Sequence, residues 1–134
     1  MTLKIRVIAP DRTVWNADAE EVILPSSTGQ LGILTGHIPL LTALDVGVMR
    51  VRVEKEWIPI VLLGGFAEVE NNVITILVNG AEEGSAINIE KAQSNLKAAI
   101  SMLSEAETSR EKFEATQKIR KARARVQAAQ INNN

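Results

Sequence analysis

The chain has 134 residues, enough for one compact domain or for a small domain with an appendage. Hydrophobic residues make up 46% of it and aromatic residues only 3%, which indicates a globular protein with an aliphatic core. It contains no cysteine, which excludes disulfides and thiolate metal sites, and its net charge is −1. No apolar run approaches the ~20 residues of a membrane-spanning helix. The N-terminal segment lacks the layout of a signal peptide. We therefore expect any membrane association to depend on a partner.

The first 87 residues show the two-residue periodicity of β-strands. In LKIRVI, apolar Leu3, Ile5 and Val7 alternate with basic side chains, as in a strand with one buried face. Further β-rich runs are EEVIL, VGVMRVRVE, WIPIVLL, FAEVE and VITILV, and they are separated by short polar linkers such as SSTG and ENN. Many short strands at this spacing predict a β-sandwich or a barrel.

After Gly84 the apolar residues take up a helical spacing. Asn88 is a predicted N-cap for a first helix, and Ser109 is a predicted N-cap for a second. Two amphipathic stripes joined by a short turn predict an antiparallel helical hairpin, so the domains are predicted at 1–87 and 88–134. Because its seam is rich in alanine, which buries little area, we expect the hairpin to dock weakly and to move. The stripes are formed by Ile89, Ala92, Leu96, Ala99, Ile100, Leu103 and Ala106, and by Ala115, Ile119, Ala122, Val126 and Ala129.

Charge is distributed unevenly along the chain. Residues 1–87 carry 6 basic and 11 acidic side chains, whereas residues 110–125 carry 7 basic and 2 acidic ones. This asymmetry predicts that the tail contacts an acidic surface. The basic run KIRKARARV, residues 118–126, has three interpretations: a nucleic-acid-binding stripe, a solvated helix face, or a contact with an acidic protein partner. The first is disfavoured because no aromatic residue interleaves with the cations and the pI is near 5.9. The other two remain open.

The only histidine, His37, lies in the glycine-rich stretch GQLGILTGHIPLLTAL. Nucleophilic catalysis would require a serine or cysteine with an orienting acid, and a metal site would require further ligands; the spacing supplies neither. The glycines match neither GxGxxG nor GxxxxGK[ST]. We therefore predict no catalytic residue, no metal and no cofactor, and we interpret His37 as a turn or contact residue.

Four stretches of the chain together resemble the epsilon subunit of rotary proton-translocating ATP synthases. They are GQLGILTGHIPLLTALDVGVMRV, LLGGFAEVENNVITILV, the opening LKIRVIAPDRTVW, and the helical hairpin after position 87. The resemblance covers essentially the whole chain. PDRTVW, GGFAEVENN and RKARARV are most similar to the chloroplast and cyanobacterial branch. Since no transit peptide is present, a cyanobacterial or plastid-encoded version is expected.

This resemblance implies a β-sandwich of about ten strands followed by two antiparallel helices, in a non-catalytic subunit of the central-stalk rotor. The sandwich is expected to bind the foot of the gamma shaft and to rest on the c-subunit ring. The subunit would then be peripheral to the thylakoid membrane, on its cytoplasmic or stromal side, and would meet the membrane only through the c ring. The rotor-contact residues implied are Gln30, Leu31, Gly32, Ile33, Leu34 and His37.

The resemblance also assigns a regulatory role to the hairpin. It lies folded on the sandwich, or it extends along the shaft and impedes ATP hydrolysis by meeting an acidic segment of the beta subunits. The residues implied in this inhibitory contact are Lys118, Arg120, Lys121, Arg123 and Arg125.

Some bacterial relatives bind ATP through an Ile/Leu-Asp-x-x-Arg-Ala motif at the first helix. The matching segment here is INIEKA, in which Ile87 and Ala92 agree with the motif. Asn88 replaces the aspartate and Lys91 replaces the arginine, and lysine cannot supply the bidentate fork of a guanidinium. We therefore predict that these positions do not bind ATP tightly.

Overall fold

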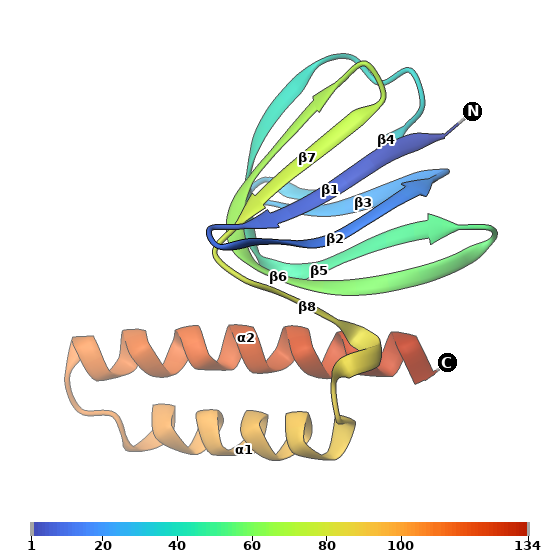
Figure 1. The fold of residues 1–134 in the computed structure, drawn as a ribbon. Helices are drawn as coiled ribbons and strands as arrows, with labels where there is room; N and C mark the ends of the chain where they lie inside the picture. Colours follow the sequence, from blue (N-terminus) through green and yellow to red (C-terminus); the bar gives the residue numbers. More distant parts are fainter. Residues whose placement is uncertain (1, 134) are drawn as a thin grey trace.

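The computed structural model describes residues 2–133, which form a two-layered β structure followed by two helices (Figure 1). The strands follow one another in the order β2-β1-β7-β6-β5-β3-β4, and β8 pairs with β6. Neighbours are antiparallel except for β1 and β7, which are parallel. The strand bounds are β1 Leu3–Ala9, β2 Arg12–Ala19, β3 Glu21–Ser26, β4 Gly29–Leu34, β5 Leu40–Val53, β6 Glu56–Glu70, β7 Val73–Val78 and β8 Ala81–Glu83.

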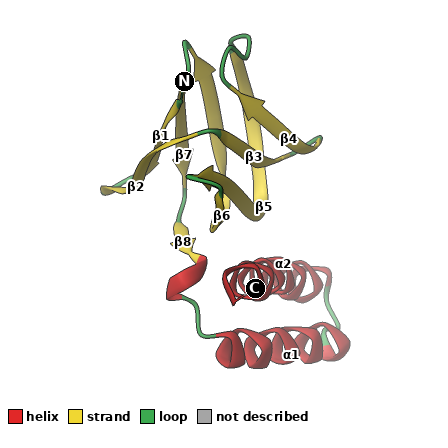
Figure 2. Ribbon diagram, turned by 90° about the vertical axis from the view of Figure 1, so that its right-hand side faces the viewer, coloured by secondary structure: helices red, strands yellow, loops and turns green. Residues whose placement is uncertain are grey.

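Two long strands connect the layers of the sandwich. β5 and β6 have 14 and 15 residues and pair with each other from Leu40 opposite Val69 to Val53 opposite Glu56. Along its length β6 changes its second neighbour, from β8 at residues 60–62 to β7 at residues 65–70. The expected sandwich is confirmed. The structure has eight strands where about ten were expected. The difference arises because β5 and β6 each run through both layers, so that each takes the place of two shorter strands (Figures 1 and 2).

The change of neighbour occurs at a pair of glycines. Gly64 and Gly65 have φ values of +81° and +149°, which L side chains rarely adopt. A Cβ atom at Gly65 would collide with the carbonyl oxygen of Leu77 on β7. The backbone therefore turns from one layer to the other at a position where a side chain would not fit.

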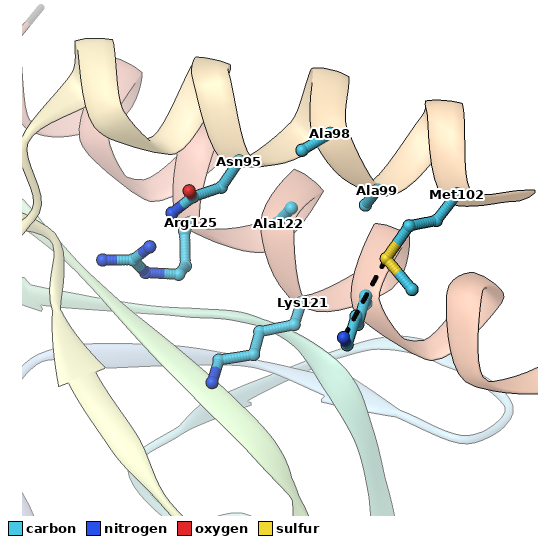
Figure 3. A pocket seen from close by; sticks show the side chains of 8 residues that line it. Asn95, Ala98, Ala99, Met102, Lys121, Ala122 and Arg125 are labelled. Atoms are coloured by element: carbon cyan, nitrogen blue, oxygen red, sulfur yellow. Dashed lines mark hydrogen bonds between the residues drawn. The ribbon is translucent and has the colours of Figure 1, made fainter.

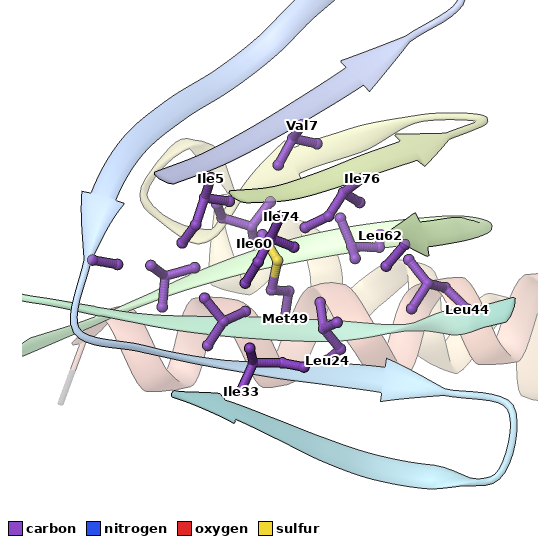
Figure 4. Packing of buried hydrophobic residues seen from close by; sticks show 14 of the residues in the cluster. Ile5, Val7, Leu24, Ile33, Leu44, Met49, Ile60, Leu62, Ile74 and Ile76 are labelled. Carbon is purple, nitrogen blue, oxygen red and sulfur yellow. The ribbon is translucent and has the colours of Figure 1, made fainter. Parts of the chain in front are cut away.

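The core between the layers is aliphatic, as the composition predicts (Figure 4). In β1 the alternation of the sequence appears directly as burial, with Leu3, Ile5 and Val7 fully buried and Lys4 and Arg6 exposed. The largest fully buried side chains are Leu3, Ile5, Val7, Val22, Leu24, Ile33, Met49, Val51, Ile60, Leu62, Ile74 and Ile76.

The two helices, α1 (Ile89–Glu105) and α2 (Ser109–Asn133), form the expected antiparallel hairpin. α2 packs against β5 and β6 and lies between the sandwich and α1 (Figures 1 and 2). Its small side chains Ala124 and Ala128 belong to one cluster with Val48 and Val61 of the sandwich. No helix in residues 2–133 is long and apolar enough to cross a bilayer.

The helix starts confirm one predicted cap and correct the other. The Asn88 Oδ1 accepts a hydrogen bond from the backbone N–H of Lys91 at 3.0 Å, as an N-cap does. The second cap is Thr108 and not Ser109. Thr108 Oγ1 accepts from the Glu111 N–H at 3.1 Å, and Glu111 Oε1 accepts from the Thr108 N–H at 3.2 Å. This reciprocal pair is a capping box, which satisfies two backbone donors at once.

The predicted apolar stripe of α2 is confirmed, with Ala115, Ile119, Ala122 and Ala129 buried, whereas the stripe of α1 is narrower than predicted. In α1 only Ala92 and Ala99 are buried, and both are small. Ile100 and Leu103, which the periodicity assigns to the packed stripe, are exposed. The reason is that α1 is the outer helix of the hairpin and has a partner on one side only.

Candidate interaction surfaces

His37 lies in the segment 35–39, called the histidine loop below, which joins β4 to β5. Its backbone N–H donates to the Leu34 carbonyl at 3.2 Å, and its Nδ1 donates to the Ile38 carbonyl at 2.7 Å. Both bonds are local to the turn. Within the described residues no serine or carboxylate side chain hydrogen-bonds to the imidazole. The geometry fits the interpretation of His37 as a turn residue.

Most of the predicted rotor-contact residues lie on the surface of β4 and the histidine loop. Gln30, Gly32 and Leu34 are exposed, and the Gln30 side chain accepts a hydrogen bond from Arg50 Nη2 at 2.9 Å. Leu31 and His37 are half-buried. Ile33 is fully buried in the core, so it supports β4 from inside and has no surface to offer a partner.

An apolar surface that the sequence patterns did not predict adjoins this loop. Ile8, Leu77, Phe66 and Ala43 lie directly opposite one another across β1, β7, β6 and β5, and therefore share one face of the sheet. Leu41 continues this face two residues along β5. Phe66, Leu77 and Leu41 are 58%, 53% and 70% exposed, and a hollow of about 590 Å³ lies beside Phe66 and Leu77. We call these five residues the apolar face.

The signal for the apolar face was present in the strand alternation. In GGFAEVE, Ala67 and Val69 are buried, so Phe66 belongs to the outward set with Glu68 and Glu70. A large apolar residue at an outward position of a strand marks a contact surface when neighbouring strands repeat it. Beside this face, Ile38 of the histidine loop is 74% exposed.

The basic run of α2 lies along the sandwich. Arg125 forms a bidentate ion pair with Glu82 of β8, with Nε–Oε2 and Nη2–Oε1 distances of 2.9 and 3.2 Å. Lys121 lines a hollow that also contains Asp11 and Glu82. On the other side of α2, Arg120 and Arg123 line a hollow with Asp45. Arg125 is thus paired with a carboxylate of the sandwich, and Arg120, Lys121 and Arg123 share hollows with others.

A groove between the two helices is lined by Lys118, Lys121 and Arg125 of this run, and Figure 3 labels the last two of them. Its volume is about 310 Å³ and its floor is formed by Ala98, Ala99 and Ala122. Lys118 lies at one end, where its Nζ is 3.9 Å from the sulfur of Met102. Lys118 is therefore on the α1 side of α2, away from the carboxylates of the sandwich.

Three of the four positions of the altered ATP motif have structural roles here. Ile87 and Ala92 are buried in the cluster between the helices and the sandwich. Asn88 uses its side-chain oxygen to cap α1, and Lys91 is exposed. Within residues 2–133, no three His, Asp or Glu side chains gather in a way that could hold a metal ion.

Comparison with known proteins relates the whole chain to one family. Residues 2–84 match the family model described as "ATP synthase, Delta/Epsilon chain, beta-sandwich domain", and residues 85–130 match the corresponding "long alpha-helix domain". The ATP synthase epsilon chain of the chloroplast of Pyropia yezoensis is 75% identical over 129 residues, which cover 96% of each chain. The ATP synthase epsilon chain of Thermosynechococcus vestitus is 62% identical over 132 residues, again covering 96% of each.

A solved structure shares the fold at much lower identity. A chain of the mitochondrial ATP synthase of Euglena gracilis superimposes with a TM-score of 0.84 at 20% identity, over 96% of this chain and 81% of that one. The matched domains, the high identity to chloroplast and cyanobacterial sequences and the shared fold agree with the resemblance seen in the sequence. The chain therefore belongs to the ATP synthase delta/epsilon chain family and is similar to the epsilon chains of its chloroplast and cyanobacterial branch.

Proposed function

We propose that this chain is a non-catalytic subunit of the central-stalk rotor of a proton-translocating ATP synthase. Membership of the family supports the assignment to this complex. The apolar face and the adjoining histidine loop support the proposal that the sandwich is the part that binds the rotor. Contiguous exposed apolar surface on a small protein marks a docking site, because leaving it in water costs free energy that a partner recovers. This surface is the observation that carries the proposal.

The partners we propose are the gamma subunit at the foot of the shaft and the ring of c subunits. The histidine loop and the exposed residues Gln30 and Leu34 would contact the rotor together with the apolar face. Contact with the c ring would place the protein at the surface of the thylakoid membrane, on its stromal or cytoplasmic side. The chain would then transmit torque between shaft and ring during ATP synthesis.

We further propose that residues 1–87 and 88–134 divide the work between rotor binding and regulation. Released from the sandwich, the hairpin would inhibit ATP hydrolysis through Lys118, Arg120, Lys121, Arg123 and Arg125, which would meet an acidic segment of the beta subunits. In the arrangement observed here, Arg125 is paired with Glu82, and Arg120, Lys121 and Arg123 line hollows that carboxylates of the sandwich also line. On this proposal, the docked hairpin is the non-inhibiting arrangement. The same contacts give no support to the alternative of a nucleic-acid-binding module.

The proposal is tested by reassembly with ATP synthase depleted of this subunit. Phe66→Ser removes the largest side chain of the apolar face, and we expect the concentration needed to restore coupled ATP synthesis to rise about tenfold, as for loss of a buried aromatic contact. Phe113→Ser is the matched control, since Phe113 is a phenylalanine of the hairpin that is 64% exposed and outside that face. Equal reassembly of wild-type and Phe66→Ser chains would contradict the docking role.

A further inference from the structure

We propose that Asn72 is a positioning residue that holds the histidine loop in the shape required for rotor binding. This inference rests on the proposed function. Asn72 lies in the turn between β6 and β7, and its side-chain oxygen accepts a hydrogen bond from the Gly36 N–H at 2.7 Å. Its backbone carbonyl also accepts from the Lys4 N–H at 2.8 Å. One residue therefore joins the turn, the start of β1 and the histidine loop.

The histidine loop has few other restraints. In the described part of the chain, the remaining hydrogen bonds of residues 35–39 are the two local bonds of His37. Ile38 and Pro39 are exposed, so packing does not fix this end of the loop. The Gly36–Asn72 bond is the hydrogen bond that links the loop to a segment 36 residues away.

A fixed loop matters because ordering a contact segment on binding reduces affinity. With the bond in place, the loop that carries the exposed Ile38, three residues before Leu41 of the apolar face, is already ordered before any partner arrives. Without it, the loop has to be ordered during association. A single hydrogen bond is worth about three- to tenfold in an equilibrium constant, and we expect an effect of that size on rotor binding.

The position requires two properties that asparagine combines. The backbone φ of Asn72 is +63°, in the left-handed region that asparagine and glycine tolerate. The side-chain oxygen of Asn72 is the acceptor for the Gly36 N–H. Asn72→Gly retains the backbone conformation and removes the acceptor. Asn72→Asp retains the acceptor. The neighbouring Asn71 has a φ of +51° and an exposed side chain, so Asn71→Gly is a control for the turn itself.

The experiment uses full-length chains in two measurements. In the isolated chain, hydrogen exchange of the Gly36 amide is followed by NMR. We expect this exchange to be about three- to tenfold faster in Asn72→Gly than in the wild type, Asn72→Asp or Asn71→Gly. In reassembly with subunit-depleted ATP synthase, we expect Asn72→Gly to bind about three- to tenfold more weakly. Asn72→Asp and Asn71→Gly should stay close to wild type.

Ile38→Ser separates this inference from the proposed function on which it rests. If Ile38→Ser binds weakly and Asn72→Gly binds like wild type, the loop is a contact surface and the positioning role is wrong. If neither variant binds more weakly, the contact surface itself is refuted and the positioning role with it. Unchanged exchange of the Gly36 amide in Asn72→Gly would overturn the inference, as would equal weakening by Asn71→Gly.

Discussion

Arg125 of α2 donates two hydrogen bonds to the carboxylate of Glu82, a residue of the short strand that leads into the hairpin. The two residues are 43 positions apart, and their side chains are 22% and 36% exposed. The pair therefore links the C-terminal half of α2 to the sandwich, at a site that is partly exposed to water. A partly exposed, bidentate pair of this kind contributes about 0.5–1 kcal/mol to the docking of the hairpin on the sandwich.

The first prediction concerns this ion pair. Glu82→Gln should release the hairpin more often, because the amide cannot replace the charge of the carboxylate that faces Arg125 and Lys121. In the isolated chain, hydrogen exchange of the α2 amides should be about two- to fivefold faster. In the reassembled complex, ATP hydrolysis should be inhibited more strongly.

Glu83→Gln is the matched control for this prediction. Glu83 is adjacent and carries the same charge, but it accepts from Ser85 and does not contact Arg125. Equal exchange rates in Glu82→Gln and Glu83→Gln would show that the ion pair does not hold the hairpin. The double variant Glu82→Arg with Arg125→Glu restores opposite charges and should return the α2 exchange rates toward wild type.

A second prediction follows from the division between sandwich and hairpin. A chain that ends after Asn88 keeps β1 to β8 and both candidate rotor-contact surfaces. It should assemble into the complex and raise its ATP hydrolysis, because the cations to which we assign the inhibition are gone. The measurement is the ATPase rate of complexes reassembled with each chain. Failure of the shortened chain to assemble would show that the hairpin also takes part in rotor binding.

The third prediction concerns the nature of the inhibition. Replacing Arg120, Lys121 and Arg123 together by glutamine removes three cations and leaves the Arg125–Glu82 pair intact. If charge dominates, this chain should inhibit hydrolysis less than wild type, and its inhibition should depend less on salt, since exposed ionic contacts are screened. The readout is the ATPase rate at two salt concentrations. Unchanged inhibition would indicate a steric block.

The fold followed from patterns that are local in the sequence. The alternation of LKIRVI predicted the burial of β1, and the change of period after Gly84 predicted the hairpin. The Thr108 cap was missed because serine and threonine are both good caps, and the choice depends on the returning bond from Glu111. The exposure of Ile100 was missed because periodicity gives the apolar side of a helix and not the number of its neighbours.

The surfaces could be predicted only in part, for a physical reason. The histidine loop was located because its glycines and proline are adjacent in the sequence. The Arg125–Glu82 ion pair and the Gly36–Asn72 hydrogen bond each join residues that are 36 or more positions apart. Such contacts depend on the strand register and on how the hairpin docks, and no local sequence pattern contains that information. Phe66 is an intermediate case. Its outward position follows from the alternation of β6 in the sequence, but its place in a row of apolar side chains across four strands depends on the strand register.

The last prediction concerns the glycine at which the sandwich changes layers. Gly65→Ala should destabilise the chain by more than about 2 kcal/mol, because the new methyl group meets the Leu77 carbonyl and the backbone φ is +149°. Gly32→Ala is the control, since nothing lies within 4 Å of the position that its new methyl group would take and its φ is ordinary. It should change stability by less than about 0.5 kcal/mol. Urea unfolding of the isolated chains measures both, and similar midpoints would show that β6 bends without needing glycine.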